Sequence, residues 1–188
     1  TFVLYDMQKQ KLIIHNQARA QKRYTPASTF KIANSLIGLE TKAVKNIDEQ
    51  IPYLGSENPF IVSWKENMGL RKAIAISNVP IYQELARRIG LKRMKHYLKI
   101  FEYGNADTGA IIDRFWLDGP IEISALEQVE FLKKLVKEEL PISKGAQRDV
   151  KQILLFESAD DYKLYAKTGW QNAPDSGIGW FVGWIENA

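Results

Sequence analysis

The two ends of the chain carry strand-like sequence, whereas its long middle carries helical sequence. TFVLYD (1–6) and KLIIHN (11–16) flank the polar turn MQKQ, which is typical of a β-hairpin. YKLYAKTGW (162–170) and GIGWFVGWIE (177–186) predict two further strands, with the turn-forming QNAPDSG between them. We therefore expect an α/β (α+β) fold in which an antiparallel sheet from the chain ends carries an inserted helical lobe.

Helical patterns fill the middle of the chain, and the length of 188 residues predicts a single domain. We place the sheet lobe at 1–24 and 160–188 and the helical lobe at 25–159. The clearest helix start is the capping box of Ser124 and Glu127. Helices are expected over 26 to about 40, 69–76, 80–90, 91–101, 124–140 and 143–155, with 80–101 alternatively forming one helix broken at Gly90.

Composition excludes several kinds of chemistry. The chain has no cysteine, so disulfides and thiolate–metal sites are impossible. Its two histidines, His15 and His96, are far apart in the sequence, which argues against a histidine metal site and against a Ser–His–Asp triad. The net charge is +4, and the basic run at 87–99 is interpreted as a solvated helix face, because no nucleic-acid motif accompanies it. We expect neither a metal nor a nucleic-acid partner.

The segment TPASTFKIANSLIGLE (25–40) predicts a buried helix, because apolar residues surround it on nearly all sides. Thr25 is expected to cap its N-terminus and Pro26 to take the first helical position. Ser28 and Lys31 lie three residues apart in it, so their side chains share a face. Burial lowers the pKa of a lysine, and a neutral amine can take a proton from a serine hydroxyl. The pair is a candidate nucleophile and base.

A second polar group ends the strand-like run near the C-terminus. Lys167 and Thr168 would present a cation and a hydroxyl to an anionic substrate, and Gly169 would let that substrate approach closely. S-x-x-K followed by K-T-G matches the signature of penicillin-recognising serine enzymes. The third element of that signature is S-D-N, and Ser77-Asn78-Val79 stands in its interval with an apolar third residue.

The order and spacing of these motifs resemble the class D serine β-lactamases, the oxacillinases, over essentially the whole chain. The resemblance rests on STFK, S-x-V, Tyr103-Gly104-Asn105, FWLDGPIEIS and KTGW. It implies a fold like that of serine β-lactamases and penicillin-binding proteins. It also implies hydrolysis of β-lactam antibiotics, of the penicillin and oxacillin type, through an acyl-serine intermediate.

The resemblance assigns roles around the nucleophile. Lys31 matches the lysine that class D enzymes carboxylate with carbon dioxide, which would make it an anionic base for Ser28; no other cofactor is implied. Trp116 matches the tryptophan whose indole N–H holds that carboxyl group. Ser77 matches the serine that relays a proton to the leaving nitrogen, and Val79 matches the apolar residue that shields the lysine.

The remaining assignments concern the substrate. Lys167 and Thr168 match groups that bind the β-lactam carboxylate and tune Ser77. The backbone N–H groups of Ser28 and Trp170 match the oxyanion hole, and Tyr103-Gly104-Asn105 matches a motif near the cleft.

The family pattern continues past IENA with a strand and a helix, and the strand is expected between the N-terminal hairpin and GWFVGWIE. The same fold also serves β-lactam sensor domains, which acylate without turnover, and penicillin-binding transpeptidases, against which Val79 argues. An inactive fragment is a more distant alternative. The resemblance further implies a periplasmic or secreted location, and a homodimer is compatible with the sequence.

Overall fold

The computed structural model describes residues 1–59, 61–171 and 177–187. Most of the turn predicted at QNAPDSG therefore lies outside the described residues. The helical elements are α1 (Gln17–Gln21), η1 (Ala27–Phe30), α2 (Lys31–Glu40), η2 (Val62–Trp64), α3 (Leu70–Ala75), α4 (Val79–Ile89), α5 (Leu91–Ile100), α6 (Ala125–Val136) and α7 (Lys144–Ile153). Within these ranges, none of the helices has the length and apolar character needed to span a bilayer.

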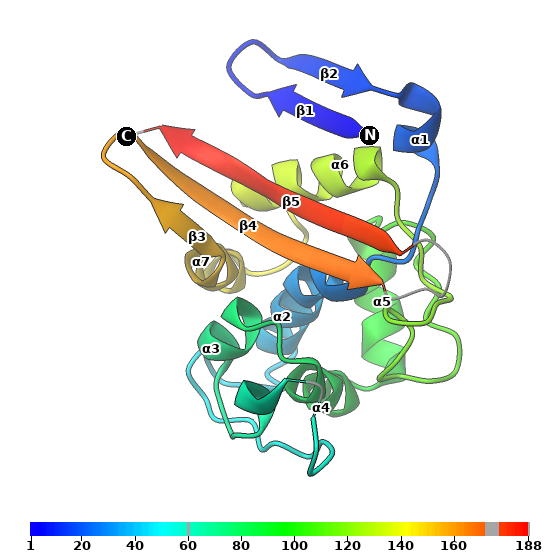
Figure 1. Ribbon diagram of the computed structural model, residues 1–188, viewed down its shortest axis with the longest axis vertical. Coiled ribbons are helices and arrows are strands. Elements are labelled where there is room, and N and C mark those ends of the chain that lie inside the picture. Colours follow the sequence, from blue (N-terminus) through cyan, green and yellow to red (C-terminus); the bar gives the residue numbers. More distant parts are fainter. Residues whose placement is uncertain (60, 172–176, 188) are drawn as a thin grey trace.

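The strands form two separate antiparallel sheets. The hairpin joins β1 (Phe2–Asp6) to β2 (Lys11–His15), and the second sheet has the order β3 (Leu155–Ser158), β4 (Tyr162–Gln171), β5 (Ile178–Asn187). Helix α6 contacts both β1 and β5. Figure 1 shows the hairpin at one end of the molecule, next to α6 and β5, with α3 and α4 at the other end. The strands predicted at both chain ends are confirmed, with no pairing between the two sheets in the described ranges.

Strand β3 was not predicted. The helix expected over 143–155 ends at Ile153, and Leu155 pairs with Tyr165 of β4 instead. The amide of Ala166 also bonds to the carbonyl of Leu154 at 2.9 Å. A short apolar run such as ILLF has no periodicity that separates helix from strand. The end of this run becomes a strand because the backbone of β4 pairs with it.

Local signals set the other helix boundaries. The capping box of Ser124 and Glu127 is present at the start of α6, and Asn78 caps α4 by accepting from Ile81 N at 3.1 Å. Between α4 and α5 the chain turns at Gly90, whose φ is +80°, so this region forms two helices. Residues with side chains rarely adopt that conformation, and glycine adopts it freely.

Helix α2 lies at the centre of the helical lobe and is buried from Lys31 to Gly38. It contacts α4, α5 and α7 and the 3₁₀ turn η1 that precedes it (Figure 1). A helix enclosed in this way has no solvent face, which agrees with its nearly continuous apolar sequence. The enclosure fixes the position of the side chains at the first turn of α2.

The face of the second sheet that points away from the helices is apolar and exposed. Phe156, Phe181 and Ile185 have exposed fractions of 58%, 60% and 63%. The rings of Phe156 and Phe181 meet edge to face at 5.9 Å. We call these three residues the outer sheet face. On β5, Phe181 and Ile185 alternate with Val182 and Trp184, which pack against the core.

Candidate active site

Ser28 lies in η1, a single 3₁₀ turn, rather than in the α-helix expected there. The turn is held by Thr29, whose amide and hydroxyl both bond to the carbonyl of Pro26, at 3.2 and 2.7 Å. The predicted cap at Thr25 is wrong. Its hydroxyl accepts from Gln171 at 3.3 Å, and its carbonyl accepts from the Trp180 indole at 3.0 Å. Bonds to β4 and β5 therefore replace the local cap.

Lys31 follows directly and forms the start of α2. Its Nζ donates to the Oγ of Ser28 at 2.7 Å, and its side chain is fully buried. Burial, with a smaller contribution from the positive charge of Lys167, holds the pKa of Lys31 well below its usual range. A neutral amine at this distance can accept the serine proton. The Nζ also lies 5.4 Å from the centre of the Tyr82 ring.

An aromatic cluster packs beside this pair. Trp116 stacks on Phe30 at 5.3 Å between ring centres and meets Phe115 edge to face at 5.1 Å. The Trp116 indole N–H is buried, and it has no hydrogen-bond partner among the described residues. A buried donor without a partner costs about 1–3 kcal/mol, so such groups are rare in native proteins. The site therefore offers a hydrogen bond to an acceptor that the described polypeptide does not supply.

Lys167 reaches the site from the sheet. It is buried, its Nζ bonds to the carbonyl of Thr168 at 3.1 Å, and burial lowers its pKa to about 8. Strand β3 pairs with β4 only as far as Leu155 and Tyr165. Beyond Tyr165, β4 extends to Gln171 and contacts η1. The Thr168 hydroxyl is also within 3.4 Å of the Nζ. The Lys31 amine thus contacts the Ser28 hydroxyl, and the Lys167 amine lies near enough for its charge to lower the pKa of Lys31.

Ser77 lies in the turn between α3 and α4. Its φ is +56°, a strained value for a residue with a side chain, and its side chain is half-buried. Val79 begins α4 and is also half-buried, as a residue flanking the site would be.

The whole chain, residues 1–188, matches the family described as the penicillin binding protein transpeptidase domain. It is 45% identical to the probable β-lactamase YbxI of Bacillus subtilis over 99% of this chain and 69% of that protein. It is likewise 45% identical to β-lactamase OXA-48 of Klebsiella pneumoniae, over 98% of this chain and 69% of that protein. The chain belongs to the class D β-lactamases.

Solved structures of class D enzymes agree with this assignment. FUS-1 (OXA-85), a class D β-lactamase from Fusobacterium nucleatum subsp. polymorphum, superimposes with a TM-score of 0.95 at 46% identity. That match covers 99% of this chain and 77% of the other. A class D β-lactamase of Bacillus subtilis superimposes with a TM-score of 0.93 at 44% identity, covering 98% of this chain and 77% of the other. The resemblance and the fold inferred from the sequence are therefore confirmed.

In this class D chain, Gly169 lies close to η1, a contact that the sequence did not predict. A Cβ at this position would lie 3.0 Å from the carbonyl oxygen of Pro26 and 3.0 Å from the side chain of Thr29. The α-hydrogen that a Cβ would replace therefore faces η1, and the small size of Gly169 lets β4 approach the turn that carries Ser28. The neighbouring Trp170 is 64% exposed.

Tyr103, Gly104 and Asn105 act as scaffold in the structure. The Tyr103 ring is fully buried against Phe30. Gly104 has a φ of +53°, and a Cβ there would lie 2.0 Å from the carbonyl oxygen of Glu122. The Asn105 amide donates to Pro120 O at 2.9 Å and accepts from Glu122 N at 3.1 Å. The motif thus ties its loop to the segment that comes after Trp116.

Sequence reasoning did not identify the hydrogen bond that joins η1 to α6 in the interior. Gln128 of α6 donates to the hydroxyl of Thr29 at 2.9 Å in the buried interior. Gln128 and Thr29 are 99 residues apart in the chain, so no local pattern could reveal this contact. Its effect is to fix Thr29, the residue next to Ser28.

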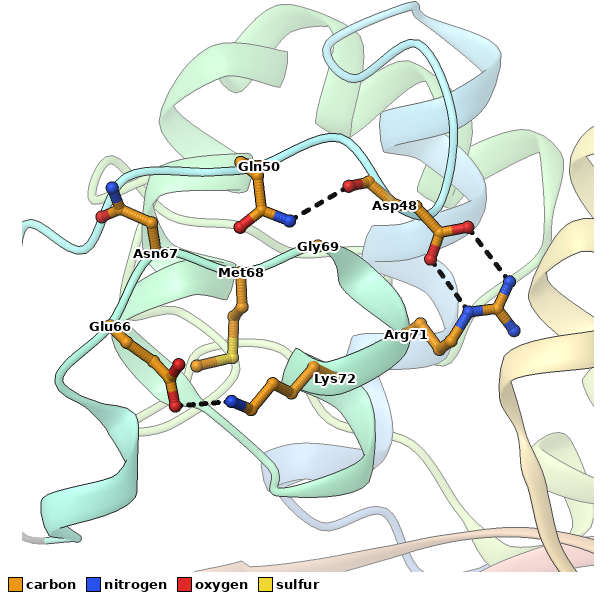
Figure 2. Close-up of a pocket in the computed structure, with 8 residues that line it drawn as sticks. All are labelled: Asp48, Gln50, Glu66, Asn67, Met68, Gly69, Arg71 and Lys72. Carbon is orange, nitrogen blue, oxygen red and sulfur yellow. Dashed lines mark hydrogen bonds and ion pairs between the residues drawn. The ribbon is translucent and has the colours of Figure 1, made fainter.

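A polar cavity of about 260 Å³ lies away from these residues, beside α3. Figure 2 shows two ion pairs among its lining residues: Arg71 with Asp48 at 2.9 Å and Lys72 with Glu66 at 2.6 Å. A second cavity of about 280 Å³ lies against α6. Neither is lined by Ser28, Lys31 or Lys167. Over the described ranges no cluster of side chains could hold a metal ion.

Proposed function

We propose that this protein hydrolyses β-lactam antibiotics of the penicillin and oxacillin type, with Ser28 as the nucleophile and Lys31 as the general base. The observation that carries this proposal is the 2.7 Å contact between Ser28 Oγ and the fully buried Nζ of Lys31. Relatives named as β-lactamases at 45% identity support the same activity.

The first step forms an acyl-serine. The Lys31 side chain takes the proton of Ser28, and Oγ attacks the lactam carbonyl carbon. The developing oxyanion accepts from the backbone N–H groups of Ser28 and Trp170. The C–N bond of the ring then breaks, and the nitrogen takes a proton through the hydroxyl of Ser77. Lys167 and Thr168 hold the substrate carboxylate and keep Ser77 polarised.

The second step releases the product. The Lys31 side chain takes a proton from a water molecule, whose oxygen attacks the ester carbon. The bond to Ser28 Oγ breaks, the serine recovers its proton, and a penicilloate-type acid leaves. Val79 limits the access of bulk water to Lys31 in the meantime.

We further propose that Lys31 acts in its carboxylated form. A carboxyl group derived from carbon dioxide would supply an anionic oxygen base that a plain amine lacks. Two features of the site fit this group: a neutral, fully buried amine able to add carbon dioxide, and the indole N–H of Trp116 in the adjacent cluster, which has no partner among the described residues. A buried anion needs such a donor.

Turnover of nitrocefin with and without added bicarbonate tests the proposal. A sustained steady state is expected, and carbon dioxide depletion should lower its rate. A single burst without turnover would instead identify a β-lactam sensor. Mass spectrometry after exposure to penicillin should locate an adduct on the peptide that contains Ser28. An adduct elsewhere, together with full activity of Ser28→Ala, would contradict the assignment of the nucleophile.

A further inference from the structure

The turn that presents Ser77 ends α3 with a left-handed residue, and two backbone bonds join it to that helix. Ser77 has a φ of +56°. A left-handed backbone is unfavourable for an L-residue, and it persists where neighbouring contacts impose it. Within the turn, Ser77 N bonds to Ile74 O at a long 3.2 Å, and Asn78 N bonds to Ala73 O at 2.8 Å. These bonds tie the turn to α3 on one side only.

Trp64 holds the turn from the other side. Its indole Nε1 donates to the carbonyl of Ile76, the residue before Ser77, at 3.0 Å. Its own backbone carbonyl accepts from the side-chain amide of Asn78, the residue after Ser77, at 3.0 Å. Ile76, Asn78 and Trp64 thus form a closed ring of hydrogen bonds that spans Ser77. We call this ring the Trp64 clamp.

The clamp is anchored at Asn78. Asn78 is fully buried, and its side-chain oxygen caps α4 by accepting from Ile81 N at 3.1 Å. The amide group can therefore not rotate away from Trp64 without releasing the cap. Trp64 ends η2, a segment that the sequence places in a loop-rich region. A loop residue in this position fixes the chain on both sides of one serine.

We propose that Trp64 is a positioning residue for Ser77 and so controls ring opening by this enzyme. The inference rests on the proposed role of Ser77 in proton delivery to the leaving nitrogen. Without the indole donor, the carbonyl of Ile76 loses its tie to η2, and the turn that carries Ser77 is held from the α3 side alone and shifts. The Ser77 hydroxyl then moves away from the path of the proton. Acylation slows, whereas deacylation, which depends on Lys31 and water, keeps its rate.

The test compares Trp64→Phe with the wild type by pre-steady-state kinetics. Phenylalanine keeps an aromatic ring and removes the donor. A displacement on the order of 1 Å lowers a rate by up to about 100-fold, so we expect acylation to fall by roughly 10- to 100-fold. The deacylation rate and the bicarbonate dependence should remain those of the wild type. Asn78→Ser, which keeps a capping oxygen and removes the amide donor to Trp64, should show the same selective loss.

Trp184→Phe is the matched control. It removes an indole donor that bonds to Glu186 at 3.0 Å on β5, away from the turn, and acylation should be unchanged. The decisive measurement is Trp64→Phe in a Ser77→Ala background, where a residue acting only through Ser77 causes no further loss. Additive losses would show a general structural effect and overturn the inference. Equal losses in acylation and deacylation would also overturn the inference, as would an acylation rate in Ser77→Ala equal to that of the wild type. Neither outcome would contradict the proposed function, which is supported by steady turnover of nitrocefin by the wild-type protein.

Discussion

Around Lys31, polar atoms are buried without partners in the described part of the chain, whereas on the outer sheet face large apolar side chains are exposed to solvent. The first region includes the indole N–H of Trp116 and the side-chain oxygen of Asn34, which lack partners among the described residues. The second includes Phe181 and Ile185, each at least 60% exposed. Both depart from ordinary packing, in opposite directions.

Of these two departures from ordinary packing, only the buried polar atoms that lack partners in the described ranges indicate a site of chemical reaction. An unpartnered buried donor loses its hydration and gains nothing in return from the described residues, so a bound water, an ion or a reacting group is expected to use it. Exposed apolar surface instead indicates a place where another surface can associate, and it says nothing about reaction. Changes in the first region should therefore alter rates, and changes in the second should alter solubility.

The largest effect is expected in the first region, at Gly169, where β4 packs against η1. In Gly169→Ala the new methyl group would lie 3.0 Å from Pro26 O and must push β4 away from η1. We expect nitrocefin turnover to fall by roughly 10- to 100-fold, because Lys167 moves away from Ser28. Gly179→Ala on β5 is the control, since a Cβ there meets nothing within 4 Å among the described residues. If both variants keep full activity, the close approach of β4 to η1 is not needed for catalysis.

Trp116→Phe tests the unpartnered donor directly. A hydrogen bond to a charged group contributes about 1.5–3 kcal/mol, which corresponds to roughly 10- to 100-fold weaker retention of the carboxyl group on Lys31. The variant should need more bicarbonate for half-maximal activity and should deacylate more slowly. In carbon dioxide-free buffer its melting temperature should stay close to that of the wild type, because the donor has no partner among the described residues. An unchanged bicarbonate requirement would remove Trp116 from the mechanism.

The pH profile tests Lys167. Because its pKa is lowered to about 8, the amine is charged below that pH and neutral above it. Binding of a substrate carboxylate should weaken as the pH rises through 8, with KM increasing up to about tenfold per pH unit. A negative charge on Lys31 would raise the pKa of Lys167, so bicarbonate should move this limb to higher pH. A KM that stays flat from pH 7 to 10 would contradict the role.

The lowered pKa of Lys167 also affects the stability of the fold, and this effect changes with pH in the direction opposite to substrate binding. Between about pH 8 and the ordinary lysine value of 10.5, the unfolded chain binds more protons than the folded one. Stability contributed by Lys167 therefore rises with pH across this window, while carboxylate binding falls. Chemical denaturation of the wild type and of Lys167→Met at several pH values would separate the two effects.

The smallest effect on activity is expected at the outer sheet face. Phe181→Thr removes an exposed ring and its edge contact with Phe156, a contact worth about 0.5–1.5 kcal/mol. Nitrocefin turnover should be unchanged, and light scattering at high protein concentration should decrease. A large loss of turnover would show that this face takes part in the reaction, and the contrast between the two regions would fail.

Short-range patterns predicted most of the elements, and they failed where distant parts of the chain compete. The hairpin, the capping box at Ser124 and the break at Gly90 depend on residues a few positions apart, and all are present. The cap predicted at Thr25 is absent because Gln171 and Trp180, more than 140 positions away, bond to it instead. Strand β3 and the role of Gly169 escaped prediction for the same reason.

The reactive pair was accessible to sequence reasoning because its geometry is local. Ser28 and Lys31 are joined by one turn of backbone, and the apolar residues around them reveal the burial that lowers the lysine pKa. Trp64 and Gln128 gave no such signal. Each acts through a bond to a segment whose position only the folded chain determines.

The 3₁₀ turn at Ala27–Phe30 explains why the motif has two residues between serine and lysine. With three residues per turn, side chains at i and i+3 are eclipsed, so the hydroxyl and the amine point the same way. Each residue added to such a turn rotates the later side chains by about 120° around its axis. A single insertion or deletion between Ser28 and Lys31 would therefore turn the amine away from the hydroxyl while leaving the composition of the helix intact. The length of this segment is therefore as important to the geometry of the pair as the identity of Ser28 and Lys31.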